Sequence, residues 1–323
     1  MRATAAVAMA ALLLCSWPQT IAQPVTQKCS ADALGVARVV EVDTLNGPRF
    51  GHQQYKDIDF LKEGEVILTF DDGPSRAHTP AVLAALDAHC TKATFFSVGR
   101  MALSDPEMLR ETARRGHTIG THTWSHKDIR RLAPAQARYE IELGISAVSA
   151  ALGQPAAPFF RFPYLSDPQS AQALLQQRDV AIFSIDADSY DYKTPDGATI
   201  QRNVMRRLAV TKKGIILFHD IQGSTARGLK GLLDQLKEQG FKVVHVIPKA
   251  PSVTVAEFDA IAGKALGNKR VAESGNPLAK RSVVWPIAPE PVAAAPAASP
   301  QPAPTPARSA PVEDDWRAKV FGR

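Results

Sequence analysis

The sequence predicts an α/β protein in which parallel strands are covered by helices, as a barrel or as an open sheet. Three observations favour this class. Apolar runs of strand length alternate with stretches of helical periodicity from residue 65 to about residue 249. Polar side chains stand at the ends of several of these runs. The chain has 323 residues, 45% of them hydrophobic, enough to bury the core of one large domain or two small ones.

The alternation begins with the apolar run VILTF, residues 66–70, which has the composition of a buried strand. A helical pattern follows, with Pro80 in the first turn, where proline is tolerated. A later helix is predicted to start at the capping residue Asp105 and to end at Gly116. The predicted strands are 66–70, 92–99, 117–122, 159–163, 180–186, 214–220 and 241–247, and the predicted helices are 79–89, 105–116, 134–153, 170–178, 198–210 and 224–240.

The composition changes on both sides of this main domain, residues 64–250. Residues 23–63 mix short apolar groups with Gly and Asp, and we expect an extension packed on the domain. Residues 251–285 are predicted to form a C-terminal extension that includes a helical stretch. Residues 286–323 are predicted to be disordered, because this Pro/Ala-rich segment buries too little surface to offset its ordering entropy.

The N-terminus has the pattern of a secretory signal peptide, residues 1–22. Arg2 provides the positive start, an apolar run extends from Ala3 to Trp17, and a small-x-small pattern allows cleavage near Ala22. The apolar run is shorter than the ~20 residues of a membrane-spanning helix, so no stable membrane insertion is expected. We therefore expect a secreted or periplasmic protein, and the Pro/Ala-rich tail is compatible with association with the cell envelope.

Cysteine content and charge set further expectations. Removal of the signal peptide would leave Cys29 and Cys90, which either form a disulfide, as an even pair in an exported chain often does, or stay as two separate thiols. The formal net charge of +6 is spread along the chain. No basic stripe is interleaved with aromatic residues, so nucleic-acid binding is not expected.

The polar residues at the predicted strand ends indicate where the chemistry lies. In parallel α/β folds, functional groups gather at the carboxyl ends of the strands, whatever the function. In this chain the residues at or just after those ends are Asp71, Asp72, His122, His126, Arg161, Asp188, Asp191, His219 and Asp220.

The histidines at positions 122 and 126 have the spacing that places two imidazoles on one face of a helical turn, where both can bind one metal ion. Alone, this spacing is more typical of a surface or core pair. A carboxylate from a neighbouring strand end would complete a site with open positions for water and substrate, as in hydrolytic zinc enzymes. Of the adjacent Asp71 and Asp72, one would bind the metal and the other would accept a proton from water. The alternative for Asp-Asp before Gly-Pro is a turn with helix-capping acids.

A base of this kind needs an acid as its partner. His219 is the candidate, because imidazole can protonate a leaving group near neutral pH, and Asp191 would orient it and raise its basicity. Arg161 is costly to bury unpaired, so we expect it to pair with a carboxylate, with Asp71 as the first choice. The structural alternative for His219 is a core histidine bonded to the backbone, and the alternative for Arg161 is a surface salt bridge.

Five motifs in order resemble those of the polysaccharide deacetylases, carbohydrate esterase family four, which includes chitin, chito-oligosaccharide and peptidoglycan deacetylases. They are TFDDGP at 69–74, HTWSH at 122–126, RFPY at 161–164, DSYDY at 188–192 and LFH at 217–219. The resemblance spans roughly residues 65–247 and implies that 64–250 is the catalytic domain. It also implies a distorted (β/α) barrel with fewer than eight parallel strands.

The resemblance further implies a role for each site residue. The metal ligands would be Asp72, His122 and His126, holding one divalent ion, with zinc expected first and cobalt or manganese as alternatives. The general base would be Asp71, steadied by Arg161, and the general acid His219, oriented by Asp191. The oxyanion would accept a hydrogen bond from the backbone N–H of Tyr164, and the acetyl methyl group would lie against Tyr192 and Leu217.

The implied reaction removes N-acetyl groups from a polysaccharide or oligosaccharide that contains N-acetylglucosamine and releases acetate. The alternatives are an O-acetyl esterase acting on xylan or another glycan, a hydrolase of a small amide, and a catalytically silent glycan-binding relative. Two departures from the family pattern affect substrate choice. Leu165 stands where many members have Gly, and Tyr192 stands where many have Trp.

Overall fold

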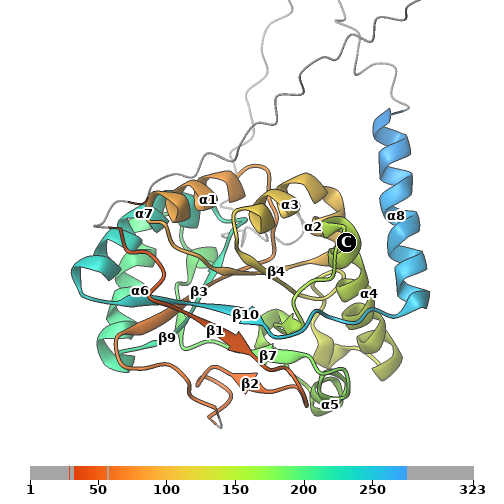
Figure 1. The fold of residues 1–323 in the computed structure, drawn as a ribbon, viewed down its shortest axis with the longest axis horizontal. Helices are drawn as coiled ribbons and strands as arrows, with labels where there is room; N and C mark the ends of the chain where they lie inside the picture. The colour runs from red at the N-terminus through yellow and green to blue at the C-terminus, as the bar shows by residue number, and fades with distance from the viewer. Residues whose placement is uncertain (1–28, 30–32, 57, 275–323) are drawn as a thin grey trace, which may run out of the picture.

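The computed structural model describes residue 29, residues 33–56 and residues 58–274 (Figure 1). The predicted signal peptide, 1–22, and the predicted Pro/Ala-rich tail, 286–323, lie outside the described residues.

The described residues form one sheet and a set of surrounding helices. The strands are β1 (Arg38–Val42), β2 (Arg49–Phe50), β3 (Glu65–Asp71), β4 (Thr94–Ser97), β5 (Thr118–Thr121), β6 (Phe159–Phe160), β7 (Ala181–Phe183), β8 (Ala187–Asp188), β9 (Gly214–His219) and β10 (Lys242–Pro248). The α-helices are α1 (Thr79–Ala88), α2 (Gly99–Ser104), α3 (Pro106–Arg114), α4 (Pro134–Leu152), α5 (Gln169–Gln177), α6 (Gly197–Thr211), α7 (Gly223–Glu238) and α8 (Ala256–Ser274). Three short 3₁₀ helices are η1 (Ile129–Arg131), η2 (Pro163–Leu165) and η3 (Asp191–Lys193).

The sheet is an incomplete barrel of parallel strands, which confirms the predicted fold class. Strands β4, β5, β6 and β7 follow one another on one side of β3, and β9 and then β8 lie on its other side. Among the described residues no pairing joins β7 to β8, so the barrel is open there. Strand β2 lies along β7, and β10 and β1 extend the sheet from the first residues of β3. Figure 1 shows the helices around the outside of these strands.

Strand β3 illustrates how the sequence positions the site. It is buried along its whole length, and its residues alternate between two hydrophobic clusters. Val66, Leu68 and Phe70 pack against helices α1 and α7, while Ile67 faces the barrel interior with Phe96 and Phe183. Because side chains alternate along a strand, the odd-numbered residues that continue from Ile67, Thr69 and Asp71, also face inwards. The interior of the barrel therefore ends in a carboxylate.

All six predicted helices of the main domain are confirmed, and their ends follow local chemistry. Helix α3 begins after Asp105, whose side chain accepts a hydrogen bond from the backbone N–H of Met108. Helix α4 ends at Gly153 in the left-handed conformation, with φ of 75°. The sequence did not predict α2, β2 or β8, because these short elements show neither a continuous apolar run nor a repeated helical period.

Both extensions pack on the barrel where they are described. The N-terminal one contributes β1 and β2, and a disulfide between Cys29 and Cys90 ties it to the end of α1. The C-terminal one contributes α8, which packs on α4 through the rings of Phe258 and Tyr139, with centroids 5.9 Å apart. The domain boundaries themselves stay predictions.

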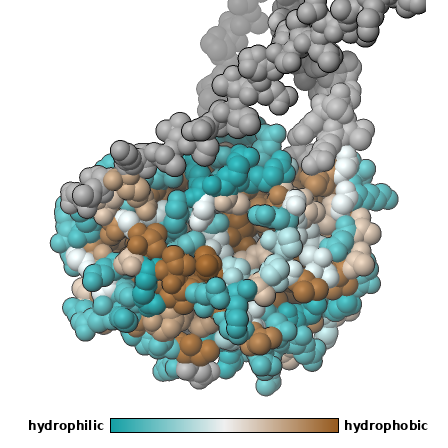
Figure 2. Space-filling view, in the orientation of Figure 1, coloured by the Kyte–Doolittle hydropathy of each residue, from teal (hydrophilic) through white to brown (hydrophobic). Residues whose placement is uncertain are grey.

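The surface adds two observations. None of the helices in the described part of the chain combines the length and the apolar character that crossing a bilayer requires. Figure 2 shows a mixed surface with hydrophobic side chains gathered over β1 and β10, where Val39 is 54% exposed.

Candidate active site

The carboxyl ends of β3 and β9 bring two chemically active side chains together. The strands pair in register, with Asp71 beside His219. Both side chains are nearly buried, and both line one cavity of about 350 Å³. The predicted convergence of polar groups at the strand ends therefore holds for these two residues.

A second group at the same end of the barrel has the composition of a metal site. Asp72 follows β3, and His122 and His126 lie in the segment after β5. The Nε2 atom of His126 is 3.2 Å from Oδ1 of Asp72, and Nε2 of His122 is 3.6 Å from the same oxygen. One ligand atom from each residue lies within 4.8 Å of the others, and all three side chains are buried.

The two histidines reach this position on a loop, so the expected helical turn between them is wrong. Thr123 and His126 have positive φ angles of 65° and 59°, which a helical turn does not allow. Helix α4 supports the loop from behind. A Cβ on Gly144 would stand 2.6 Å from the carbonyl carbon of Thr123, so only glycine permits this approach. Glu140 of the same helix accepts hydrogen bonds from both the backbone N–H and the hydroxyl of Ser125.

The three residues fit a divalent cation. Both carboxylate oxygens of Asp72 are buried without a hydrogen-bond partner, an arrangement that is costly unless a cation compensates it. Burial raises the pKa of Asp72 to about 7 and lowers that of His122 to about 3, so the imidazole is neutral. Its Nδ1–H lies 2.7 Å from the carbonyl oxygen of Arg161, which leaves the Nε2 lone pair directed at Asp72. Nitrogen and carboxylate ligands of this kind suit zinc.

Arg161 is fully buried inside the barrel and pairs with Asp71, as the sequence predicted. Its Nη1 donates to Oδ1 of Asp71 at 2.7 Å and to the hydroxyl of Thr69 at 2.8 Å. Its other nitrogens donate to the carbonyl oxygens of Phe183 and Ser184. Burial raises the pKa of Asp71, and the charge of Arg161 opposes part of that rise. The guanidinium therefore favours the ionised carboxylate, against the effect of burial.

His219 is held in the same way by Asp191. Its Nδ1 lies 2.7 Å from Oδ1 of Asp191, and its backbone N–H donates to Oδ2 at 2.7 Å. Burial favours the neutral ring, but the charge and hydrogen bond of Asp191, together with the charges of Asp72 and Asp71, outweigh burial and raise the pKa of His219 to about 10. The Nε2 atom lies 4.0 Å from Oδ2 of Asp72, so it points at the cluster of Asp72 and the two histidines. Thr225 donates to Oδ2 of Asp191 and fixes that carboxylate.

The remaining predicted residues line the same cavity. Tyr164 lies in η2 with φ of 59°, and its half-exposed ring stands edge-on to that of His126, with centroids 4.8 Å apart. The ring centroid of Tyr192 lies 5.5 Å from that of His219. Leu217, two residues before His219 in β9, is buried and also lines the cavity. Leu165, the other departure from the family pattern, also lines the cavity.

Asp220, like Asp188, is a strand-end residue for which the sequence predicted no role. It is buried, its Oδ2 accepts from the hydroxyl of Thr79, and burial raises its pKa to about 7. A side chain on Gly73 would collide with this carboxylate, so the Gly of the first motif is required by packing. Glu140 gave no signal at all, because a Glu in an amphipathic helix has the composition of a solvent-facing residue.

Comparisons with known proteins agree with this geometry. The family model "Polysaccharide deacetylase" matches residues 61–182. A chitooligosaccharide deacetylase of Bradyrhizobium is 31% identical over 199 residues, which are 57% of this chain and 89% of the relative. The chain belongs to the polysaccharide deacetylase family. The match to a longer peptidoglycan-N-acetylglucosamine deacetylase of Listeria monocytogenes, at 29% identity, covers 56% of this chain and 38% of that relative.

Solved structures of the polysaccharide deacetylase family have the same fold. A peptidoglycan deacetylase of Bdellovibrio bacteriovorus superposes with a TM-score of 0.60 at 31% identity and covers 66% of this chain and 59% of its own. A family pseudoenzyme of Bacillus anthracis superposes at 0.53 with 25% identity, covering 57% of this chain and 64% of its own. Family membership thus includes a pseudoenzyme, so activity depends on the site residues themselves.

Proposed function

We propose that this chain is an exported, metal-dependent hydrolase that removes N-acetyl groups from N-acetylglucosamine units of a polysaccharide or oligosaccharide. The observation that carries the proposal is the presence of a candidate base and a candidate acid side by side in one cavity. Arg161 pairs with Asp71, Asp191 holds the ring of His219, and both Asp71 and His219 border the same cluster of Asp72 and two histidines.

The proposed metal ligands are Asp72, His122 and His126, with zinc as the first expectation. When bound, a divalent ion would supply Lewis-acid polarisation of the acetyl carbonyl and lower the pKa of water at the site. The neutral state of His122 and the unpartnered oxygens of Asp72 support this assignment.

The side chains would then divide the proton transfers. Asp71 accepts a proton from water as the water oxygen forms a bond to the acetyl carbonyl carbon. His219 donates its Nε2 proton to the amide nitrogen as the carbon–nitrogen bond breaks, so that acetate and a free amine leave. The Tyr164 backbone N–H would donate to the oxyanion, and Tyr192 and Leu217 would enclose the acetyl methyl group.

Acetate release from a panel of substrates tests the proposal. The metal-loaded protein is incubated with chito-oligosaccharides, peptidoglycan and acetylated xylan, with Asp71→Asn as the blank. Release from an N-acetylated substrate, absent in the blank, supports N-deacetylation. Release from xylan alone would favour the O-acetyl esterase, and no release by protein that holds its metal would favour a small-amide hydrolase or a silent glycan-binding relative.

Export can be tested separately. The predicted signal peptide and the disulfide between Cys29 and Cys90 both suit an oxidising compartment. Mass spectrometry of the protein recovered from the periplasm or medium should find an N-terminus at Gln23. A full-length chain confined to the cytoplasm would contradict this part of the proposal.

A further inference from the structure

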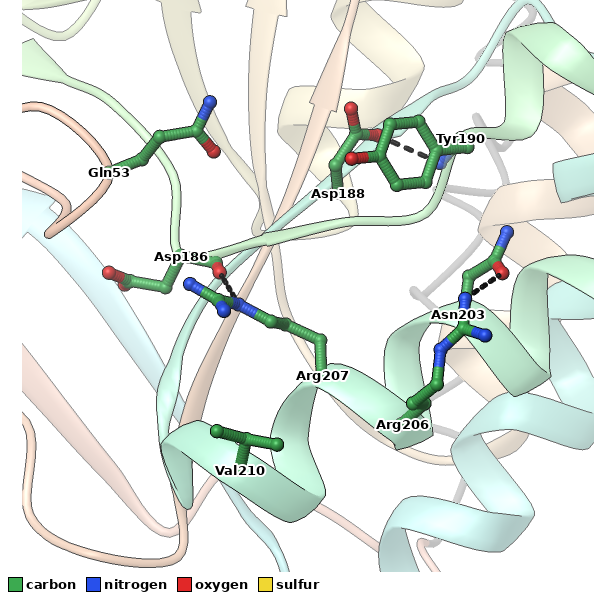
Figure 3. Close-up of a pocket in the computed structure, with 8 residues that line it drawn as sticks. All are labelled: Gln53, Asp186, Asp188, Tyr190, Asn203, Arg206, Arg207 and Val210. Atoms are coloured by element: carbon green, nitrogen blue, oxygen red, sulfur yellow. Dashed lines mark hydrogen bonds between the residues drawn. The ribbon is translucent and has the colours of Figure 1, made fainter.

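A second hollow adjoins the catalytic cavity on the side of α6 (Figure 3). It has a volume of about 500 Å³ and shares Gln53, Asp188 and Tyr190 with the catalytic cavity. Its other lining residues include Arg206 and Arg207. A sugar chain with one unit in the catalytic cavity would therefore have its neighbouring unit beside two guanidinium groups.

The two arginines have only neutral partners. Arg206 donates from Nη2 to the side-chain oxygen of Asn203 at 3.1 Å, and Arg207 donates from Nε to the backbone carbonyl of Asp186 at 2.8 Å. In the described residues neither forms an ion pair with a carboxylate. By contrast, Arg202, one turn earlier on α6, pairs with Asp196 at 3.5 Å. Since a guanidinium carries five N–H donors, most of those on Arg206 and Arg207 remain available to a ligand.

The two acids of the hollow do not compete for these arginines. The carboxylate oxygens of Asp186 accept from the backbone N–H groups of His52, at 2.6 Å, and Ile215, at 2.7 Å. Those of Asp188 accept from the backbone N–H of Tyr190 and the hydroxyl of Tyr192. Figure 3 shows Arg206 beside Asn203 and the Arg207 side chain extending along the hollow towards Asp186. The acids therefore support the local backbone while the guanidinium groups face the hollow.

A hollow that adjoins the catalytic cavity through Tyr164 lacks this feature. It also contains basic side chains, but both are already paired. Lys127 lies 3.5 Å from a carboxylate oxygen of Glu140, and Arg131 lies 3.3 Å from one of Asp128. Of these two hollows, the one beside α6 is therefore the one whose basic side chains are not paired with a carboxylate of the described residues.

We propose that Arg206 and Arg207 form a subsite that binds the carboxylate of a sugar adjacent to the one being deacetylated. This inference rests on the proposed function and deepens it. A planar guanidinium matches a carboxylate with two parallel hydrogen bonds, and the exposed ring of Tyr190 offers an apolar face to the sugar. The subsite favours a glycan in which a carboxylated sugar alternates with N-acetylglucosamine over an uncharged chitin chain.

The test compares two oligomers that differ in the charge of one substituent with a third that lacks the substituent. One is a peptide-free oligomer of alternating N-acetylglucosamine and N-acetylmuramic acid. The second is the same oligomer with its carboxylates converted to primary amides, and the third is a chito-oligosaccharide of equal length. The metal-loaded full chain is compared with Arg206→Gln and Arg206→Gln/Arg207→Gln. Arg202→Gln removes the same charge from the same helix outside the hollow and serves as the matched control.

We expect the double variant to lose about tenfold in kcat/KM on the free-carboxylate oligomer, the size of one or two charged hydrogen bonds. On the amidated oligomer and on the chito-oligosaccharide it should stay within about twofold of the parent. Equal losses on all three substrates, or the same loss in Arg202→Gln, would overturn the subsite.

Binding gives a readout that does not depend on turnover. Calorimetry of the two muramic-acid oligomers with Asp71→Asn protein should show tighter binding of the free carboxylate, and adding Arg206→Gln/Arg207→Gln should remove that preference. An unchanged preference overturns the subsite. A preference found in a protein that releases no acetate from any substrate would instead uphold the subsite and reject the proposed function.

Discussion

The buried pair of Arg161 and Asp71 gives the sharpest energetic prediction. Replacing Arg161 with Met keeps an unbranched side chain but leaves the carboxylate inside the barrel without its cation. Thr69, Phe183 and Ser184 lose a donor at the same time. Breaking a buried ion pair from one side costs about 3–5 kcal/mol, so we expect the free energy of unfolding to fall by that amount.

A double-mutant cycle separates the pair from its surroundings. Arg161→Met, Asp71→Asn and the double variant are unfolded in urea and followed by tryptophan fluorescence. Each single variant leaves one buried charge uncompensated, whereas the double variant leaves none. We therefore expect the double variant to lose about 1–3 kcal/mol less than the sum of the two singles. Additivity within about 0.5 kcal/mol would refute the claim that the pair is coupled.

The same substitution makes a prediction about pH. Burial raises the pKa of Asp71, and Arg161 opposes that rise, so removing Arg161 should raise this pKa further. The base is inactive when protonated, so the acid limb of the kcat/KM profile should move to higher pH. Residual activity should then recover as pH rises. A profile whose acid limb stays in place would contradict the assigned base.

Three further substitutions test the other parts of the site. His122→Ala should lose both the bound metal, measured by elemental analysis, and turnover, and retention of either would contradict its role. Asp191→Asn should lower the pKa of His219 and move the alkaline limb of kcat/KM to lower pH, because the charge that keeps the ring protonated is gone; an unmoved limb would exclude His219 as the acid. Gly144→Ala should displace the loop that carries His122 and His126, because the added Cβ would collide with Thr123. It should lower stability by about 1–3 kcal/mol and weaken zinc binding, measured by calorimetry. Gly263→Ala in α8, where a Cβ meets nothing within 4 Å, is its control, and equal effects would refute the steric argument.

Much of the fold could be predicted from the sequence because the long elements of the fold are periodic. Strands β3 and β9 are continuous apolar runs, and α3 and α4 carry their own start and stop residues. Short elements without an apolar run or a helical period, such as β8 and α2, leave no such pattern. The opening between β7 and β8 depends on which strands pair with one another, and the sequence of a single segment does not specify that pairing.

The candidate site was predictable for a related reason. Residues at strand ends converge whatever lies between them, so Asp71, Arg161 and His219 could be placed together before the structure was known. The loop that carries His122 was not predictable from spacing, because its shape depends on contacts with α4. Those contacts come from Gly144 and are specified about twenty residues further along the chain.

Removal and return of the metal shows whether deacetylation depends on a cation held by Asp72, His122 and His126. The purified full chain is stripped with a chelator, and acetate release from a chito-oligosaccharide or peptidoglycan substrate is measured before and after zinc, cobalt or manganese is restored. We expect acetate release to disappear on stripping and to return as the restored ion binds at one site per chain. Undiminished acetate release by the stripped protein would contradict this dependence.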